Sequence, residues 1–570
     1  MSRWAYVGLT AILAAVVAAW AIPKANITSF SVGYFGTEPG APVPLPTLSF
    51  DTFVIGDSAQ LLLLAVGVGL LVQLYSVAYL GEHPRYRSYA LIIVLFLLGM
   101  IAVVATDNLW VLLIGWEVMG LCSYVLIGHD WERREARAGA AKAFLVTRVA
   151  DLALVLAILV IGQTYGTYSI LGTWLEASDH PRNATAIGLL VLIAVIGKSA
   201  QFPLQSWLPD AMPGPTPITA LIHAATMVAA GVFLLVRLFP LYSMSTVVVT
   251  SMAVVAMITM LLGAVMALGQ TDLKRALAWS TVSQLALMIA AVAASDPGAA
   301  IDHLVAHGAF KALLFLGCGC VMHAVGTSAL SAMGGLRRVM PVTFWTMTIG
   351  FAALAGVVPT VGFFTKDGVL EALHTATDGD GALSGGAAWV ALVVAVLTSF
   401  ITALYAMRLW LLTFFGDAPT SDQERLEPHE APWTMAGPLV VLAVATLALS
   451  IGKPFHLGMG ILSTVVAAAG IVTSYAMWKR VPGLRVRTRG LERAIDAPIS
   501  RWIPAITRGA SRLVLAVDDD GVDAYSHGGA AGARLASRGL DLVQSRNVQR
   551  YATVMAAGVV VLVIAAVIAS

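Results

Sequence analysis

Long apolar runs, separated by short polar or Pro/Gly-rich breaks, fill most of the chain. A helix that spans a bilayer needs about 20 mostly apolar residues, and many of the runs reach that length. The pattern predicts fifteen membrane-spanning helices, at residues 4–22, 58–80, 87–105, 109–128, 141–163, 185–209, 216–239, 246–268, 273–294, 299–324, 342–373, 386–416, 433–452, 457–478 and 552–569. It is typical of an all-α polytopic membrane protein.

The composition supports a membrane protein and excludes other classes. Hydrophobic residues make up 58% of the chain, charged residues 12%, and the mean hydropathy is +0.84, which excludes a water-soluble enzyme. A net charge of +2 gives no indication of nucleic-acid binding. The three cysteines, Cys122, Cys318 and Cys320, lie in apolar runs, and no His/Cys group has the spacing of a zinc or iron–sulfur site. Since the glycine-rich nucleotide motifs are also missing, we expect no metal, nucleotide or redox centre in this chain.

Lysine and arginine are distributed unequally over the predicted connections. Alternate connections contain most of them, at Arg85, Arg87, Arg133, Arg134, Arg137, Arg337, Arg338, Arg425 and the basic stretch 479–512. The other connections contain little more than Lys24, Arg182 and Lys453. Because positively charged connections stay in the cytoplasm, we expect a cytoplasmic N-terminus and, after fifteen spans, a C-terminus outside.

The segment at about 481–550 departs from the pattern of spans, because it is basic and never reaches span length. Apolar residues recur there at helical spacing, at Ile495, Ile499, Trp502, Ile503 and Ile506. This spacing predicts an amphipathic helix along the membrane surface or against neighbouring spans. A solvated linker is the alternative, and the Gly-rich stretch 528–539 is less typical of a helix.

Lysine is used differently from arginine. Of only eight lysines, Lys198, Lys311 and Lys366 lie inside apolar runs and Lys274 lies at the start of another, whereas the 26 arginines serve mainly the polar connections. A buried lysine can release its proton, but an arginine keeps its proton. The pattern favours exchangeable protons within the membrane; the alternative is that these lysines extend to the interface or form static ion pairs.

Carboxylates and broken helices accompany the first of these lysines. Glu117 lies in the middle of an apolar run, where an unpaired carboxylate would be costly, and Lys198 is its predicted partner across a helix interface. Prolines between 203 and 217 predict a broken helix directly after Lys198, and His223 follows in the next span. Arg148 and Asp151, one turn apart, are predicted to form a local pair.

Three titratable residues share one face of a later predicted helix. His303, His307 and Lys311 recur at positions i, i+4 and i+8. This spacing favours a proton relay; a satisfied core histidine is the alternative, and no carboxylate or cysteine in this helix completes a metal site with the two histidines.

A second broken helix is predicted near Lys366. Pro359, Gly362 and Gly368 interrupt the apolar run, which places Lys366 at the break with Asp367 beside it. Two broken helices that each contain a lysine indicate an internal repeat of the kind found in transporter cores.

Six stretches carry a family resemblance, in this order between about residues 50 and 416: GWEVMGLCSYVLIG, KAFLVTRVAD, GKSAQFPLQSWLPDAMPGPTPITALIHAATM, QTDLKRALAWSTVSQ, HLVAHGAFKALLF and GFFTKD. They resemble the antiporter-like subunit 5 (NuoL) family of respiratory complex I, a type I NADH:quinone oxidoreductase, within the wider cation/proton antiporter-like family. The basic segment and the last span resemble that subunit's lateral helix and final span.

The resemblance implies two inverted five-helix repeats, each with a discontinuous helix, joined by a charged axis at the membrane midplane. The residues implied in proton translocation are Glu117, Lys198, His223, His303, His307, Lys311 and Lys366, supported by Arg148, Asp151, Lys274 and Asp367. The implied organisation is N-terminal helices at 1–105, a first repeat at 106–239, a second repeat at 240–416, additional helices at 417–480, a lateral segment at 481–550 and a last helix at 551–570.

The resemblance also implies partners and a location. It implies a proton-translocating subunit of a membrane oxidoreductase in a bacterial plasma membrane, with NADH, flavin, iron–sulfur clusters and quinone held by partner subunits. Neighbouring antiporter-like subunits would contact the lateral helix. Large subunits of multisubunit cation/proton antiporters and of energy-converting hydrogenase complexes share the core, so a subunit of either assembly is the alternative.

Overall fold

The computed structural model describes residues 2–21, 51–54, 56–179, 181–224, 226–379, 381–416, 428–480, 488 and 490–497, and, beyond residue 500, residues 501, 505, 508–509, 511–512 and 530–538. Residues 1–499 form one compact unit and residues 500–570 a second. Over the described ranges the secondary structure is helical, with isolated β-bridges and no strand.

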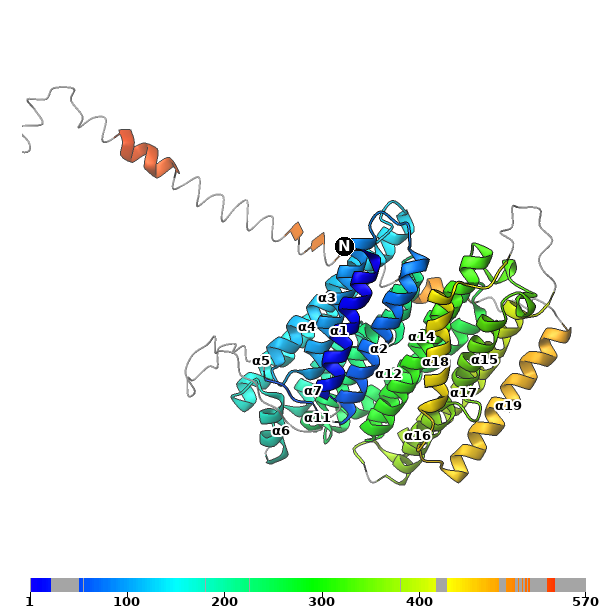
Figure 1. The fold of residues 1–570 in the computed structure, drawn as a ribbon. Helices are drawn as coiled ribbons and strands as arrows, with labels where there is room; N and C mark the ends of the chain where they lie inside the picture. The colour runs from blue at the N-terminus through cyan, green and yellow to red at the C-terminus, as the bar shows by residue number, and fades with distance from the viewer. Residues whose placement is uncertain are drawn as a thin grey trace, which may run out of the picture. The chain divides into compact units, whose positions relative to one another are not determined.

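The first unit is a bundle of helices (Figure 1). In chain order they are α1 Arg3–Ala21, α2 Gly56–Tyr79, α3 Tyr86–Ala105, α4 Leu109–Ile127, α5 Arg134–Tyr165, α6 Ile170–Asp179, α7 Ala184–Lys198, α8 Trp207–Asp210, α9 Thr216–Ala224, α10 Met227–Arg237, α11 Phe239–Tyr242, α12 Thr246–Gly269, α13 Leu273–Ala293, α14 Pro297–Val325, α15 Pro341–Ala355, α16 Val361–Thr375, α17 Gly385–Phe414, α18 Trp433–Ala448 and α19 Leu457–Arg480.

Helices occupy the first fourteen predicted spans, and the fifteenth, 552–569, lies outside the described residues. In the described part of the chain, eleven helical segments are long and apolar enough to cross a membrane. The other three predicted spans contain the shorter apolar helices α7, α15 and α18. The prediction of an all-α polytopic membrane protein is confirmed.

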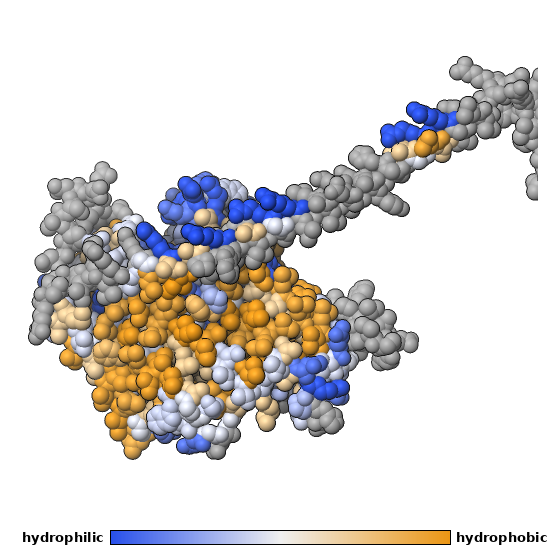
Figure 2. Space-filling view, turned by 180° about the vertical axis from the view of Figure 1, so that it is seen from behind, coloured by the Kyte–Doolittle hydropathy of each residue, from blue (hydrophilic) through white to orange (hydrophobic). Residues whose placement is uncertain are grey.

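The bundle has a fully buried centre and an apolar exterior. The most apolar windows of α13, α14 and the α9–α10 pair are buried throughout, whereas only 22% and 33% of the corresponding windows of α1 and α19 are buried. Large side chains such as Leu91, Leu152 and Val393 remain exposed, and Figure 2 shows a broad apolar surface with hydrophilic residues at its margins. An apolar surface this extensive is expected where helices face lipid.

Three interruptions divide helices inside the bundle. The chain is non-helical between Lys198 and Trp207 and between Ala355 and Val361, as the sequence predicted. Gly356 ends α15 with φ +82°, a left-handed conformation that glycine adopts readily. Lys366, however, lies inside α16. The break precedes it because Gly356 and Pro359 stand before Val361, whereas Gly362 and Gly368 are accommodated within the helix. The third interruption, after Ala224, was not predicted.

Parts of the predicted lateral segment are described. Residues 490–497 and 530–538 are helical. The second helix lies in the stretch that the sequence indicated as less helical, and its alanines, leucine and arginines explain the difference because all favour helix. Ile499, Trp502, Ile503 and Ile506 lie outside the described residues, so the amphipathic pattern there stays a prediction.

Candidate functional site

Four charged residues form one cluster between α4, α5 and α7, called here the Lys198 cluster: Glu117, Arg148, Asp151 and Lys198. Arg148 forms an ion pair with Glu117 and lies 3.6 Å from Asp151 Oδ2. The Lys198 Nζ atom lies 3.6 Å from the same Asp151 oxygen. Two cations and two carboxylates therefore balance one another.

The predicted direct pair between Glu117 and Lys198 is wrong. Glu117 pairs with Arg148 instead, and Lys198 pairs with Asp151. The longer arginine reaches both carboxylates because Gly120 has no side chain; a Cβ atom there would collide with the guanidinium. The predicted local contact between Arg148 and Asp151 is confirmed.

Lys198 is held at the end of a broken helix. It is the last residue of α7, where the carbonyl end of the helix dipole favours a cation. Its ammonium donates to Trp116 O at 3.0 Å and lies 4.7 Å from the centre of the Trp116 ring. Trp207 fixes the break itself, because its Nε1 donates to Gly197 O at 2.8 Å.

A second group of titratable residues lies around α13 and α14 and is called here the central row: Lys274, His223, Lys311, His307, His303 and Lys366. His223 interacts electrostatically with Lys311 and Lys274, and His307 interacts with Lys311, His303, His223 and Lys366. All six side chains are buried. The sequence predicted each of these residues separately, and the structure brings them into one continuous group.

Neutral oxygen atoms hold the lysines of the central row. Lys311 donates to Leu277 O at 3.2 Å and to the Ser280 hydroxyl. Lys366 donates to Leu354 O at 2.5 Å, so its ammonium lies at the end of α15, next to the break between α15 and α16. Lys274 donates to the carbonyls of Met212 and Gly214, at 2.8 Å each, in the irregular segment after α8.

The histidines of the row differ in their partners. His303 Nδ1 lies 2.9 Å from Thr365 Oγ1, and His303 Nε2 lies 3.3 Å from Gln284 Oε1. His223 and His307 have no hydrogen-bond partner among the described residues for either ring nitrogen. Buried polar atoms of this kind usually bind water, which suits a proton relay.

Asp367 faces away from Lys366. Its Oδ2 accepts a hydrogen bond from the His456 backbone at 3.1 Å and lies 3.4 Å from His456 Nδ1. Asp367 and Lys366 are neighbours in the sequence, as predicted, but their side chains have different partners because successive residues of a helix point in different directions. The carboxylate therefore anchors the connection between α18 and α19.

Two polar hollows lie at opposite ends of α13. The Gln205 hollow, about 350 Å³, lies at its start and is lined by Gln205, Ser206, Asp210, Arg275, Trp279 and Glu492, among others. The Thr365 hollow, about 510 Å³, lies at its end and is lined by Asp296, Asp302, Thr365, Glu371, Lys453 and His456, among others. Thr365 lines the Thr365 hollow and is within hydrogen-bond distance of His303, so this hollow extends to the central row.

The sequence reasoning missed the polar residues of α13. Ser280 and Gln284 contact Lys311 and His303, and Lys453 forms an ion pair with Asp302 at 2.5 Å on the Thr365 hollow. A run of polar residues within a predicted span, with Ser280 and Gln284 four apart and so on one face of the helix, would have been a usable signal.

The fold and this site define a class: a polytopic helical membrane protein whose buried titratable residues lie beside broken helices, an arrangement typical of ion transport. The chain belongs to the NADH:quinone oxidoreductase/Mrp antiporter family, whose transmembrane region matches residues 106–402. The family resemblance inferred from the motifs is thereby confirmed.

Known relatives agree with this assignment. NADH-quinone oxidoreductase subunit L of Mycobacterium tuberculosis is 38% identical over 534 residues, which cover 87% of this chain and 83% of the relative. NAD(P)H-quinone oxidoreductase subunit 5 of Paulinella chromatophora is 39% identical over 498 residues, covering 80% and 73%. A chain in a structure of the Mrp complex from Dietzia sp. aligns with this protein with a TM-score of 0.72 at 27% identity. The alignment covers 100% of this protein and 61% of the Mrp chain.

Proposed function

We propose that this chain is a proton-translocating membrane subunit of an NADH:quinone oxidoreductase of the respiratory complex I type. The central row carries the proposal, because it places six buried titratable residues in one electrostatically connected group. Quinone-oxidoreductase subunits among the relatives reach 38–39% identity, above the 27% of the Mrp chain. The roles of individual residues below are part of this proposal.

The two hollows support a path through the membrane. α13 contains 21 residues, which at about 1.5 Å per residue corresponds to about 30 Å, the thickness of a bilayer core. The Gln205 hollow and the Thr365 hollow lie at its two ends. Protons would pass between them through water and the central row, with His303 exchanging protons with the Thr365 hollow through the Thr365 hydroxyl.

The Lys198 cluster supports a contact with a neighbouring subunit. Glu117 and Arg148 belong to membrane-spanning helices, yet their side chains are 32% and 26% exposed. Charges in this position are costly against lipid. A neighbouring membrane subunit would cover them, and a change in its charge would act on Lys198 through Arg148 and Asp151.

The remaining components belong to the proposed complex. NADH, flavin, iron–sulfur clusters and quinone would be bound by partner subunits. Changes in their redox state would shift the protonation of the Lys198 cluster and of the central row. The arginine-rich connections indicate a cytoplasmic N-terminus in a bacterial plasma membrane. The Gln205 hollow would then open to the cytoplasm and the Thr365 hollow to the outside.

A cation/proton antiporter subunit is the second candidate, because the Mrp chain aligns along the whole of this one. The test is affinity purification through this chain, followed by reconstitution in proteoliposomes. We expect NADH oxidation with quinone to copurify and to drive acidification of the lumen. Sodium/proton exchange in a preparation that does not oxidise NADH would support the antiporter and overturn the proposal.

A further inference from the structure

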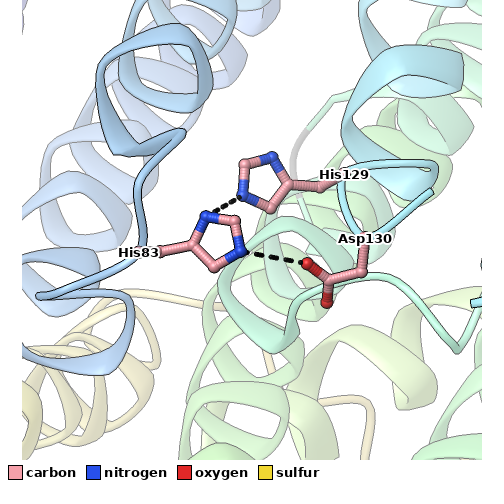
Figure 3. A group of neighbouring side chains, drawn as sticks. All are labelled: His83, His129 and Asp130. Atoms are coloured by element: carbon pink, nitrogen blue, oxygen red, sulfur yellow. Dashed lines mark hydrogen bonds and ion pairs between the residues drawn. The ribbon is translucent and has the colours of Figure 1, made fainter. Parts of the chain in front are cut away.

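Two histidines and one carboxylate converge outside the proposed proton path (Figure 3). His83 lies in the turn between α2 and α3, and His129 and Asp130 lie in the turn after α4. One ligand atom from each residue can be chosen so that all three atoms lie within 4.8 Å of one another. No short spacing motif signals the group, because His83 and His129 are 46 positions apart.

The geometry of this group is close to that of a metal site. His83 Nδ1 lies 3.2 Å from His129 Nε2, and the other ring nitrogen, His83 Nε2, lies 3.4 Å from Asp130 Oδ1. With one ligand atom taken from each residue, the three atoms lie within 4.8 Å of one another. Ligand atoms of a tetrahedral zinc ion lie about 3.3 Å apart, since zinc–nitrogen bonds measure about 2.0–2.1 Å. Rotation of the three side chains would have to bring one nitrogen of each histidine and one Asp130 oxygen from within 4.8 Å of one another to about this separation, which would complete a three-residue ligand set.

We propose that His83, His129 and Asp130 bind one divalent transition-metal ion of the zinc type, with water as the fourth ligand. Two imidazole nitrogens and one carboxylate suit zinc and its neighbours in the first transition row, whereas magnesium and calcium prefer oxygen ligands alone.

The surroundings allow an ion to reach the site. His129 is buried, but the side chains of His83 and Asp130 are 24% and 32% exposed. Arg85, a cation of the same turn that could repel a metal, is paired with Glu132 at 2.8 Å and lies over the Trp131 ring at 4.5 Å. Rigid packing of Tyr89 against His129, with ring centres 5.3 Å apart, positions the buried ligand.

A bound ion would tie two turns together on the arginine-rich side of the bundle. The Arg85–Glu132 pair already joins the same turns. Beyond His129, the end of α4 packs closely at Ile127 against Gly214, whose carbonyl holds Lys274. The ion would thus stiffen the surface next to the start of the central row.

The test is metal binding by the full complex, purified with an affinity tag that contains no histidine. Cobalt(II) is the spectroscopic probe, and zinc affinity is measured by competition with a chromogenic chelator. We expect one equivalent of metal per chain, a tetrahedral cobalt spectrum, and loss of both in His83→Gln and His129→Gln. Asp130→Asn should weaken zinc binding by about 10-fold or more.

The controls separate this site from other histidines and from misfolding. His374→Gln removes an exposed histidine of α16 and should leave the stoichiometry unchanged. Assembly of each variant is checked by size-exclusion chromatography. The proposal is overturned if the wild-type complex binds no stoichiometric metal, or if assembled His129→Gln retains it. Because the readout is binding, it does not depend on whether the chain translocates protons.

Discussion

Buried lysines have different partners in the Lys198 cluster and in the central row. In the cluster, Lys198 lies 3.6 Å from Asp151, and the same carboxylate is shared with Arg148. In the row, Lys311 and Lys366 donate only to carbonyl and hydroxyl oxygens among the described contacts, and Asp367 faces His456 instead. The cluster is compensated by opposite charge, whereas the row is not.

The two regions would therefore handle a proton differently. A charged lysine next to a carboxylate is stabilised locally, so the cluster can hold its charge in a low-dielectric environment. In the row, the neighbouring titratable residues are cationic when protonated, so a proton on one residue disfavours a proton on the next. The row therefore behaves as one coupled unit, and its lysines should be the more sensitive to substitution.

The largest effect is expected at Lys311. Lys311→Met should abolish NADH-driven acidification in proteoliposomes, because loss of a positioned proton-transfer group typically costs about 100-fold or more. Lys311→Arg should also fail and, in addition, reduce assembly, because an uncompensated buried charge costs about 3–5 kcal/mol. Lys453→Arg, in the partly exposed pair with Asp302, is the control. Normal pumping by Lys311→Arg would show that the row needs only a fixed charge.

The next effect is expected at Lys198. Lys198→Arg places a permanent cation beside Asp151, so the complex should assemble normally on a native gel while acidification falls by about tenfold or more. The contrast with Lys311→Arg is in assembly, since only position 198 has a carboxylate partner. Equal loss of assembly at both positions would contradict the distinction between a compensated cluster and an uncompensated row.

The sequence predicted which titratable residues are buried more successfully than how they pair. Apolar runs and isolated lysines are local signals, so the spans and the buried positions of Lys198, Lys311 and Lys366 could be predicted. The pairing of Glu117 with Arg148 could not, because it depends on helix rotation and on the space left by Gly120. His83 and His129 meet only after α2, α3 and α4 pack, and no local spacing indicates that contact.

The carboxylates of the cluster should differ in importance. Asp151 contacts both Arg148 and Lys198, whereas Glu117 contacts Arg148, which retains Asp151 if Glu117 is lost. Asp151→Asn should therefore lower acidification by about tenfold, since it leaves a buried cation unpaired, and Glu117→Gln should lower it less. The two rates are compared at equal complex content. A larger loss of acidification in Glu117→Gln than in Asp151→Asn would contradict this order and would support Glu117 as the main partner of Lys198.

The smallest effect is expected where residues 490–497 pack against α5 and α13 of the same unit. Acidic residues make this contact, Glu492 with Arg275 at 2.5 Å and Asp496 with Lys142 at 2.6 Å, although the segment as a whole is basic. Partly exposed ion pairs contribute about 0–1 kcal/mol each. The double variant Glu492→Gln/Asp496→Asn should therefore speed amide hydrogen exchange in 490–497 by about fivefold and leave pumping nearly unchanged. Arg493→Gln, on an exposed residue of the same helix, is the matched control. Faster exchange in Arg493→Gln than in the acidic double variant would show that the basic residues hold the segment.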